Sequence, residues 1–247
     1  MIGGAGPNWQ PYCGAAPVPA ELLGRWNLDP LLLAGLAMLA LALWRSAETP
    51  GARRSAVLAI GLALLLFVSP FCALSSALFS ARVTHHVLLA AVLAPLLVHA
   101  LPRSLRATGS LPLWTALQAI TFWLWHSPGL YAEALSSDLV YWVMQLTLTG
   151  TAVGFWFALR GASGLSAIAA LLVSTVQMGL LGALITFAGA PLFAPHFLTT
   201  EPWGLGALED QQVAGLIMWA PAAALYLIAA LVVAQRWLAG EERKVAA

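Results

Sequence analysis

The chain has 247 residues, of which 61% are hydrophobic and 9% are charged, and its formal net charge is +1. Soluble domains carry about 25% charged residues, so this composition excludes a water-soluble globular domain and indicates a protein embedded in lipid. The near-zero net charge argues against a nucleic-acid partner.

The hydrophobic residues gather into seven segments that approach the length of a membrane span. A helix crossing about 30 Å of hydrocarbon needs roughly 20 apolar residues, and open sheets cannot satisfy their backbone in lipid. We therefore predict an all-α, polytopic membrane helical bundle with seven transmembrane helices (residues 28–236), between an extracytoplasmic N-terminal tail (1–27) and a cytoplasmic C-terminal tail (237–247). In chain order the segments are Leu28–Trp44, Ser55–Cys72, Val83–Leu101, Ser110–His126, Leu139–Leu159, Leu165–Phe187 and Gln211–Ala234.

The basic residues predict an orientation for this bundle. With seven spans, most of the eleven Lys and Arg residues fall in the loops on one side, and such an excess is typical of cytoplasmic loops. Only Arg25 and Arg82 fall on the other side. The N-terminus is therefore predicted to be outside and the C-terminus in the cytoplasm. The basic residues on the predicted cytoplasmic side are Arg45, Arg53, Arg54, Arg103, Arg106, Arg160, Arg236, Arg243 and Lys244.

Side chains that commonly bind metals collect on the predicted outer side. They are Cys13, Cys72, His85, His86, His126 and His196, and they come from different segments of the chain. Thiolate and imidazole together suit Cu(I) or zinc, whereas hard ions prefer oxygen ligands. Met178 and Met218, within the last two predicted spans, could add thioether ligands that favour copper. The pattern predicts a soft-metal site near the outer face.

Each of these residues also has a structural interpretation. Two cysteines in an oxidising outer compartment often form a disulfide, and membrane histidines often bond to a neighbouring helix. His85 and His86 lie about 100° apart on a helix, so we expect at most one of them to face a shared site. His86 shares its helix face with Arg82, four residues earlier. His99 falls at the cytoplasmic end of the same segment and is expected to belong elsewhere.

Polar residues begin the last predicted span. Asp210 is placed either as the N-cap of that helix or as a carboxylate that orients a ligand histidine. Gln211 enters the membrane with an amide, and intramembrane polar groups are costly unless they face the bundle interior. In the preceding span, Gly179 and Gly182 are three residues apart and fit a close helix–helix contact.

Five sequence blocks occur in a characteristic order along nearly the whole chain. They are His86 with 94–97 (Ala-Pro-Leu-Leu), 125–135 (Trp-His-Ser-Pro-Gly-Leu-Tyr-Ala-Glu-Ala-Leu), 154–156 (Gly-Phe-Trp), 178–187 (Met-Gly-Leu-Leu-Gly-Ala-Leu-Ile-Thr-Phe), and 210–215 (Asp-Gln-Gln-Val-Ala-Gly) with 218–221 (Met-Trp-Ala-Pro). Together they resemble the CtaG-type cytochrome c oxidase assembly factors, which are bacterial multi-span membrane proteins. That family often carries a further histidine at the position of Arg82, and His85 is an additional neighbour here.

The resemblance implies a multi-pass protein of the bacterial inner membrane that assists the maturation of a haem–copper cytochrome c oxidase. It implies a metallochaperone rather than an enzyme, so no catalytic residues are predicted. The predicted cargo is copper as Cu(I), with zinc and haem as open alternatives. The predicted partners are the lipid bilayer, an oxidase subunit and a soluble copper donor. A copper transporter or a haem-binding membrane redox protein is the alternative function.

Overall fold

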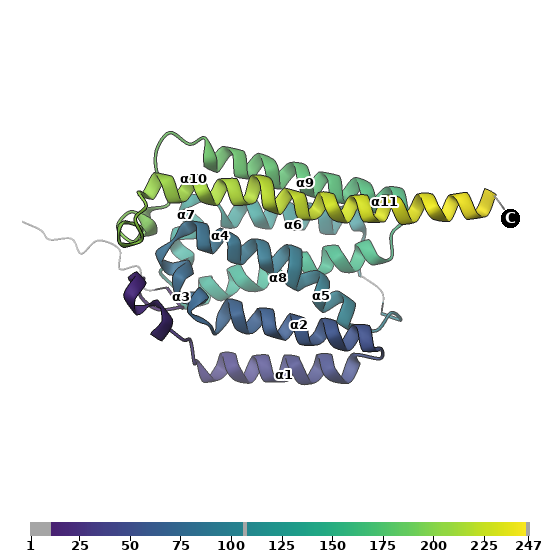
Figure 1. Ribbon diagram of the computed structural model, residues 1–247, viewed down its shortest axis with the longest axis horizontal. Coiled ribbons are helices and arrows are strands. Elements are labelled where there is room, and N and C mark those ends of the chain that lie inside the picture. Colours follow the sequence, from purple (N-terminus) through teal and green to yellow (C-terminus); the bar gives the residue numbers. More distant parts are fainter. Residues whose placement is uncertain (1–10, 106–107, 246–247) are drawn as a thin grey trace, which may run out of the picture.

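The computed structural model of the chain describes residues 11–105 and 108–245, with side chains described as far as residue 240. Within these ranges all regular secondary structure is helical, and the long helices lie side by side (Figure 1). The α-helices are α1 (Pro30–Ser46), α2 (Pro50–Phe67), α3 (Pro70–Ala77), α4 (Phe79–Leu88), α5 (Ala94–Ala100), α6 (Leu111–Trp125), α7 (Pro128–Ala134), α8 (Asp138–Arg160), α9 (Gly164–Thr186), α10 (Ala207–Ile217) and α11 (Ala223–Val245). The π-helical turns are η2 (Leu89–Leu93) and η5 (Met218–Ala222), and the 3-10 helices are η1 (Pro19–Gly24), η3 (Ala194–His196) and η4 (Glu201–Trp203).

Each of the seven predicted segments falls on helical structure. Five helices are long and apolar enough to cross a membrane by length and composition: Pro50–Phe67, Phe79–Ala100, Asp138–Arg160, Gly164–Thr186 and Ala207–Gly240. In two of these, a π turn joins α4 to α5 and α10 to α11 without a break. The remaining two, α1 with 17 residues and α6 with 15, are shorter. The all-helical fold is thus confirmed, with five helices of spanning length among the described residues.

Two of the differences between the predicted and the observed boundaries change the assignment of an element. The predicted second segment continues to Cys72, whereas α2 ends at Phe67 and Cys72 lies on the separate helix α3. The Ser69 hydroxyl accepts a hydrogen bond from the Phe71 amide (3.2 Å) and Pro70 opens α3, and a capping serine followed by proline starts a new helix. At the other end of the chain α11 continues to Val245, so most of the predicted C-terminal tail is helical.

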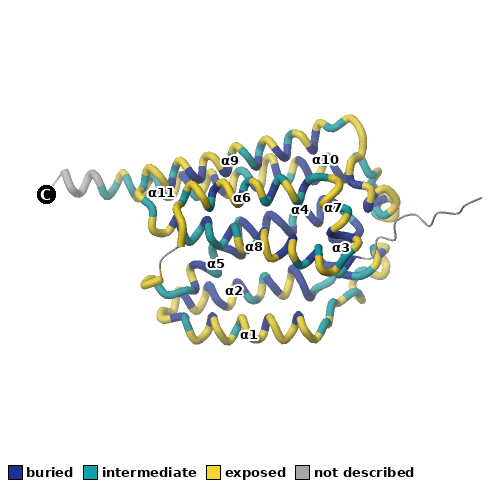
Figure 2. The backbone as a smooth tube through the Cα atoms, turned by 180° about the vertical axis from the view of Figure 1, so that it is seen from behind, coloured by how far each residue is buried: buried dark blue, intermediate teal, exposed yellow. Residues whose placement is uncertain are grey.

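Five continuous helices, two of them α4–α5 and α10–α11, form a closed ring around the larger hydrophobic core. The continuous helix α4–α5 packs on α8 and α10, α8 packs on α6, α6 packs on α9, and α9 packs on α10 and α11. Outside this ring α2 packs on α5, and α1 packs on α2 at the edge of the molecule (Figure 1). The edge helix α1 is largely exposed (Figure 2). Because its exposed residues are mostly apolar, this surface is of the kind that lipid covers.

The two ends of the bundle carry different side chains. Basic residues lie at the end where α1, α5 and α8 finish and α2, α6 and α9 begin, which is on the right in Figure 1. We call this the arginine end, and we call the opposite end, with α3, α7 and η3, the disulfide end. The described basic residues at the arginine end are Arg45, Arg53, Arg54, Arg103, Arg160 and Arg236. Arg106, Arg243 and Lys244 lie outside the described side chains.

The backbones of α9 and α10 approach closely at two glycines. A Cβ atom on Gly182 would lie 2.6 Å from the Trp219 amide nitrogen and 2.7 Å from the Gly215 carbonyl oxygen. A Cβ on Gly215 would lie 2.6 Å from the Thr186 amide nitrogen. At Gly179 the nearest heavy atom, in the Trp219 side chain, is 3.6 Å away. The predicted small-residue contact is therefore confirmed at Gly182, whereas Gly179 tolerates a side chain.

Replacing Gly182 by alanine should force α9 and α10 apart, because the new methyl group meets backbone atoms that cannot rotate away. We expect the free energy of unfolding to fall by about 1–3 kcal/mol, measured by denaturant unfolding in detergent. Gly179→Ala is the matched control on the same helix and should change stability little. Equal stability of the two variants would contradict the close helix contact.

Candidate functional site

The side chains predicted as metal ligands all lie at the disulfide end of the bundle, and all are buried. Cys13 belongs to the tail and Cys72 to α3. His85 and His86 lie on α4, His126 follows the last residue of α6, and His196 ends η3. Cys13 is the most exposed of the set, at 9%. The sequence thus placed these residues at one end of the molecule, and the structure adds that they lie beneath its surface.

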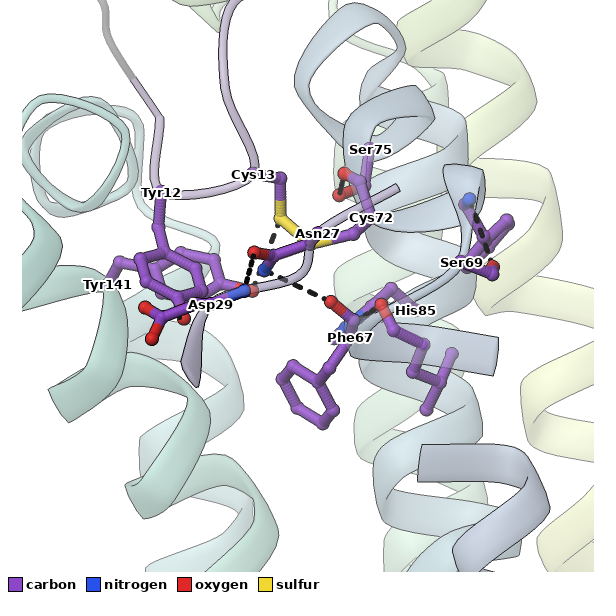
Figure 3. The surroundings of a disulfide bond; sticks show 12 residues. Tyr12, Cys13, Asn27, Asp29, Phe67, Ser69, Cys72, Ser75, His85 and Tyr141 are labelled. Atoms are coloured by element: carbon purple, nitrogen blue, oxygen red, sulfur yellow. Dashed lines mark hydrogen bonds between the residues drawn. A yellow bond between two sulfur atoms is a disulfide. The ribbon is translucent and has the colours of Figure 1, made fainter. Parts of the chain in front are cut away.

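A disulfide between Cys13 and Cys72 ties the tail to the bundle (Figure 3). The two Cα atoms are 5.4 Å apart, and the residues are separated by 59 positions in sequence. Of the two interpretations left open by the sequence, the structure contains the disulfide. Because a metal is bound by the thiolate form of cysteine, neither sulfur is a ligand in this oxidised state.

Aromatic contacts hold the tail beside the disulfide. Tyr12 stacks on Tyr141 with ring centroids 5.1 Å apart and meets Trp142 edge-on at 5.0 Å. The Tyr12 hydroxyl donates to Asp29 Oδ2 at 2.7 Å, and this bond lowers the pKa of the Asp29 carboxyl. Figure 3 shows Tyr12 and Tyr141 together on one side of the disulfide. The described part of the tail, residues 11–27, is therefore held against this end of the bundle.

Two buried histidines from different helices meet at this end of the bundle. His86 Nδ1 lies 3.5 Å from His126 Nε2, and the two rings are nearly perpendicular with centroids 5.2 Å apart. The other nitrogen of His126, Nδ1, lies 2.7 Å from the Phe122 carbonyl oxygen. Since a carbonyl can only accept, Nδ1 carries the proton and Nε2 presents its lone pair towards His86.

The His86–His126 pair has unused bonding capacity. His86 Nε2 is buried and has no hydrogen-bond partner among the described residues, although buried polar groups normally have one. The 3.5 Å between the facing nitrogens is long for a hydrogen bond. It falls within the roughly 3.3–4.1 Å that separates two nitrogens each about 2.0–2.1 Å from one ion, at tetrahedral to linear angles. The pair therefore fits two ligands of a single metal ion.

His85, the neighbour of His86, faces away from this pair. Its Nε2 lies 3.1 Å from the Leu66 carbonyl oxygen, and its ring packs edge-on against Phe67 with centroids 5.1 Å apart. Its Nδ1 has no hydrogen-bond partner in the described part of the chain. As expected from the helical spacing, one of the two adjacent histidines takes part in the pair and the other packs against α2.

His196 is fully engaged by protein groups. The Tyr131 hydroxyl donates to His196 Nε2 at 2.6 Å, and His196 Nδ1 donates to the Ala77 carbonyl at 3.2 Å. Burial lowers the pKa of His196 to about 3, so the ring is neutral and each nitrogen already has a partner. His196 connects η3 to α3 and α7, and it can bind an ion only if Tyr131 moves.

The two methionines proposed as possible ligands belong to the hydrophobic core. Met178 and Met218 are both 0% exposed and pack among apolar residues of the helix ring. Across the described ranges, no group of three or more His, Cys, Asp or Glu side chains converges closely enough to hold one metal ion. Among the predicted ligands, His86 and His126 are the two whose ring nitrogens the described structure brings face to face.

Arg82 is a buried cation one helical turn before His86. It is 0% exposed, its Nε donates to the Ser75 carbonyl at 3.2 Å, and its guanidinium lies 5.3 Å from the Tyr141 ring centroid. Tyr131 and Tyr141 are near the guanidinium. Even so, Nη1 and Nη2 form no hydrogen bond with any described residue. A charge inside an apolar helix is costly and typical of functional sites.

Asp210 caps a different helix from the one predicted. Its carboxylate accepts hydrogen bonds from the Phe79 amide (2.6 Å), the Ser80 amide (3.3 Å) and the Ser80 hydroxyl, so it caps α4. The N-cap of α10 is Gly206, whose amide donates to Glu209 Oε2 at 2.7 Å. The interpretation that Asp210 caps its own helix was wrong. Asp210 lies one turn inside α10, and its carboxylate points across to the first residues of α4. Asp210 forms no hydrogen bond with a described histidine, so it positions His86 only through α4.

Gln211 faces the bundle interior, as predicted. Its Oε1 accepts from the Leu192 amide at 2.6 Å, and its Nε2 donates to the carbonyls of Ile185 (3.3 Å) and Ala190 (3.4 Å). These bonds hold the segment that leaves α9 and leads to η3. Gln211 therefore supports the position of His196.

Sequence reasoning missed three buried polar side chains, two of which lie near Arg82. Tyr131 and Tyr141 are 0% exposed, and Gln145 is 1% exposed with both amide atoms lacking partners among the described residues. The available signal was a polar side chain inside an apolar segment, which applies to Tyr141 and Gln145 on α8. Tyr131 lies outside every predicted span, so that signal could not identify it.

Comparison with known families gave one match. The family model described as cytochrome c oxidase caa3 assembly factor (Caa3_CtaG) matches residues 35–240. The match extends from α1 into α11 and includes the His86–His126 pair, Arg82 and Asp210, but not Cys13. No curated protein and no solved structure gave a match.

Removing either cysteine should release the tail. We expect Cys13→Ser or Cys72→Ser to lower the free energy of unfolding by about 2–4 kcal/mol, because the bond restricts a long loop in the unfolded chain. The double variant should lose no more than either single variant, since both remove the same bond. Unfolding curves without reductant and mass spectrometry of the linked peptides measure this. Additive losses, or free thiols in the untreated protein, would contradict the disulfide.

Replacing Asp210 by alanine should destabilise the protein, because the amides of Phe79 and Ser80 lose a buried acceptor. We expect a loss of about 1–3 kcal/mol in unfolding free energy, measured in detergent. Glu209→Gln is the control, since it is adjacent and exposed and keeps an acceptor for its own cap. Its effect should stay within about 0.5 kcal/mol. Similar losses in both variants would show that the α4 cap has no special role.

Proposed function

Because this chain belongs to the cytochrome c oxidase caa3 assembly factor family, we propose that it binds Cu(I) transiently and passes it to an oxidase subunit. Copper is cargo in this scheme and not a resident cofactor. Transfer proceeds by exchange of one imidazole ligand after another, which needs neither a nucleophile nor a general base. The protein then acts as a metallochaperone and not as a catalyst.

The single observation that carries the copper proposal is the His86–His126 pair. Two helices, α4 and α6, bring ring nitrogens to 3.5 Å from each other, and one further nitrogen of His86 has no described partner. Imidazole suits copper, and Cu(I) forms stable complexes with two ligands. Structural zinc sites use four protein ligands, so an isolated pair favours Cu(I) over zinc.

The charge of Arg82 favours release of the ion. Arg82 lies four residues before His86 on α4 and shares its face of the helix. Two positive charges in a poorly polarisable interior repel each other strongly. The guanidinium therefore weakens the binding of Cu(I) to His86. A storage protein would gain nothing from this repulsion, whereas a donor must give its ion up.

We further propose that all seven apolar helices span the bacterial inner membrane with the N-terminus outside. The arginine end then lies in the cytoplasm, as the excess of basic residues on that side favours. The disulfide end lies in the oxidising outer compartment, where disulfides form. In this orientation a soluble copper donor approaches the tail side. The oxidase, which accepts copper within its membrane domain, meets the pair at a similar depth.

Replacing His86 or His126 by glutamine should lower the affinity for Cu(I) on the order of tenfold or more, because each supplies one of two convergent imidazoles. The measurement is copper content of protein purified under reducing, chelator-free conditions, followed by competition with a Cu(I) chelator. In a strain that lacks the native protein, the same variants should restore less oxidase activity than the wild type.

His85→Gln is the matched control, because His85 is the adjacent, equally buried residue and faces away from the pair. The His85→Gln variant shares any loss of stability that comes from altering α4, but it should retain copper. His196→Gln should have a smaller effect than the pair variants, since both His196 nitrogens are already bonded. Unchanged copper affinity in both the His86 and His126 variants would overturn the copper role and leave the family assignment intact.

A further inference from the structure

A cavity with a basic lining opens at the arginine end. It has a volume of about 690 Å³ and lies where α5, α8 and α11 approach one another. His99, Arg103, Arg160 and Arg236 contribute to its wall, and none of its described lining residues is acidic. We call this cavity the basic pocket. Its charge suits a negatively charged ligand.

Arg160 shapes the wall of the basic pocket. Its Nη1 donates to the Val98 carbonyl at 3.1 Å, and its Nη2 donates to the carbonyls of Pro102 (3.2 Å) and Leu105 (3.1 Å). These bonds fold the chain after α5 back onto the end of α8. Arg160 thereby fixes the segment that holds Arg103 at the pocket.

Three of the basic side chains have donors that the described protein does not use. Within the described part of the chain, His99, Arg103 and Arg236 form no ion pair or hydrogen bond. All three are exposed to solvent in the absence of lipid. Guanidinium groups bind phosphate through paired hydrogen bonds. Arg103, in the loop after α5, and Arg236, on α11, both line the basic pocket, so each offers its guanidinium donors to an anion bound there.

An apolar groove shares part of its wall with the basic pocket. A second cavity, of about 470 Å³, shares His99, Arg160 and Arg236 with it. The rest of the groove lies between α5, α8, α9 and α11. Its wall is formed mainly by Pro95, Val98, Trp156, Leu159, Ala167 and Val233. A basic pocket adjoining an apolar groove matches the two parts of a phospholipid, a phosphate headgroup and an acyl chain.

We propose that this composite site binds one anionic phospholipid, with its phosphate at Arg103 and Arg236 and an acyl chain in the groove. Basic clusters at the cytoplasmic end of membrane helices attract anionic headgroups. A soluble phosphate would occupy the basic pocket and leave the groove without a ligand, so the groove favours a lipid. The site lies at the opposite end of the bundle from the His86–His126 pair and does not depend on the copper proposal.

Full-length protein, delipidated in detergent, should bind phosphatidylglycerol at least tenfold more tightly than phosphatidylcholine with the same acyl chains. Lipid titration followed by native mass spectrometry measures both affinities. The double substitution Arg103→Gln and Arg236→Gln should weaken phosphatidylglycerol binding about 30-fold, since each basic side chain near the headgroup contributes about fivefold. Binding of phosphatidylcholine should not change.

Arg45→Gln with Arg54→Gln is the matched control, because it removes two exposed charges from the same end of the bundle outside the basic pocket. It should leave phosphatidylglycerol affinity unchanged. Arg103→Lys with Arg236→Lys keeps the charge and should retain most of the binding. Val233→Trp fills the groove and should lower the binding affinity for both lipids by a similar factor.

Several outcomes would overturn the proposal. Equal affinity for the two lipids in the wild type would exclude headgroup recognition. An equal loss in the control variant would show that binding follows total charge and not this pocket. Displacement of phosphatidylglycerol by inorganic phosphate at comparable concentration, together with no effect of Val233→Trp, would identify a site for a soluble anion. If the double glutamine variant does not fold, the lipid comparison in the wild type and the Val233→Trp variant decide the question.

Discussion

The carboxylate of Asp210, bonded to the first amides of α4, fixes the helix on which Arg82 and His86 lie. Without this carboxylate, the buried N-terminus of α4 would keep unpaired N–H groups. The negative charge of the carboxylate also interacts favourably with the positive end of the helix dipole. The next residue, Gln211, holds the segment that carries His196. Two adjacent side chains of α10 thus position two separate histidine-bearing segments, and the glycine contact with α9 fixes α10 itself.

The helices could be predicted from the sequence because apolar content and segment length are local properties of the chain. The break at Ser69 and Pro70 was missed because hydropathy averages over a window, whereas capping is an effect of single residues. The partner of Asp210 could not be predicted, since it depends on which helices meet in space. The same holds for Cys13 and Cys72: residue type allowed a disulfide or a metal, and only their proximity selects one.

The His86–His126 pair is buried, so an ion reaches it only when protein groups around it move. The tail is held by a covalent bond and by the stacking of Tyr12 on Tyr141, which makes it a poor candidate for rapid opening. The segments α7 and η3 are joined to each other by the single Tyr131–His196 hydrogen bond and carry no such covalent tie. At this end of the bundle, α7 and η3 are therefore less firmly tied than the tail.

The π-helical turns η2 and η5 interrupt α4–α5 and α10–α11; Pro95 follows η2 at the start of α5, and Pro221 lies inside η5. A π turn accommodates one extra residue, and one residue corresponds to about 100° of rotation around a helix. A helical wheel drawn through α4 consequently misassigns the faces of α5. Deleting any single residue within 89–93 would restore a regular helix and rotate His99 relative to His86. Such a length change would alter the orientation of the two ends of the molecule relative to each other, while every side chain discussed above stayed present.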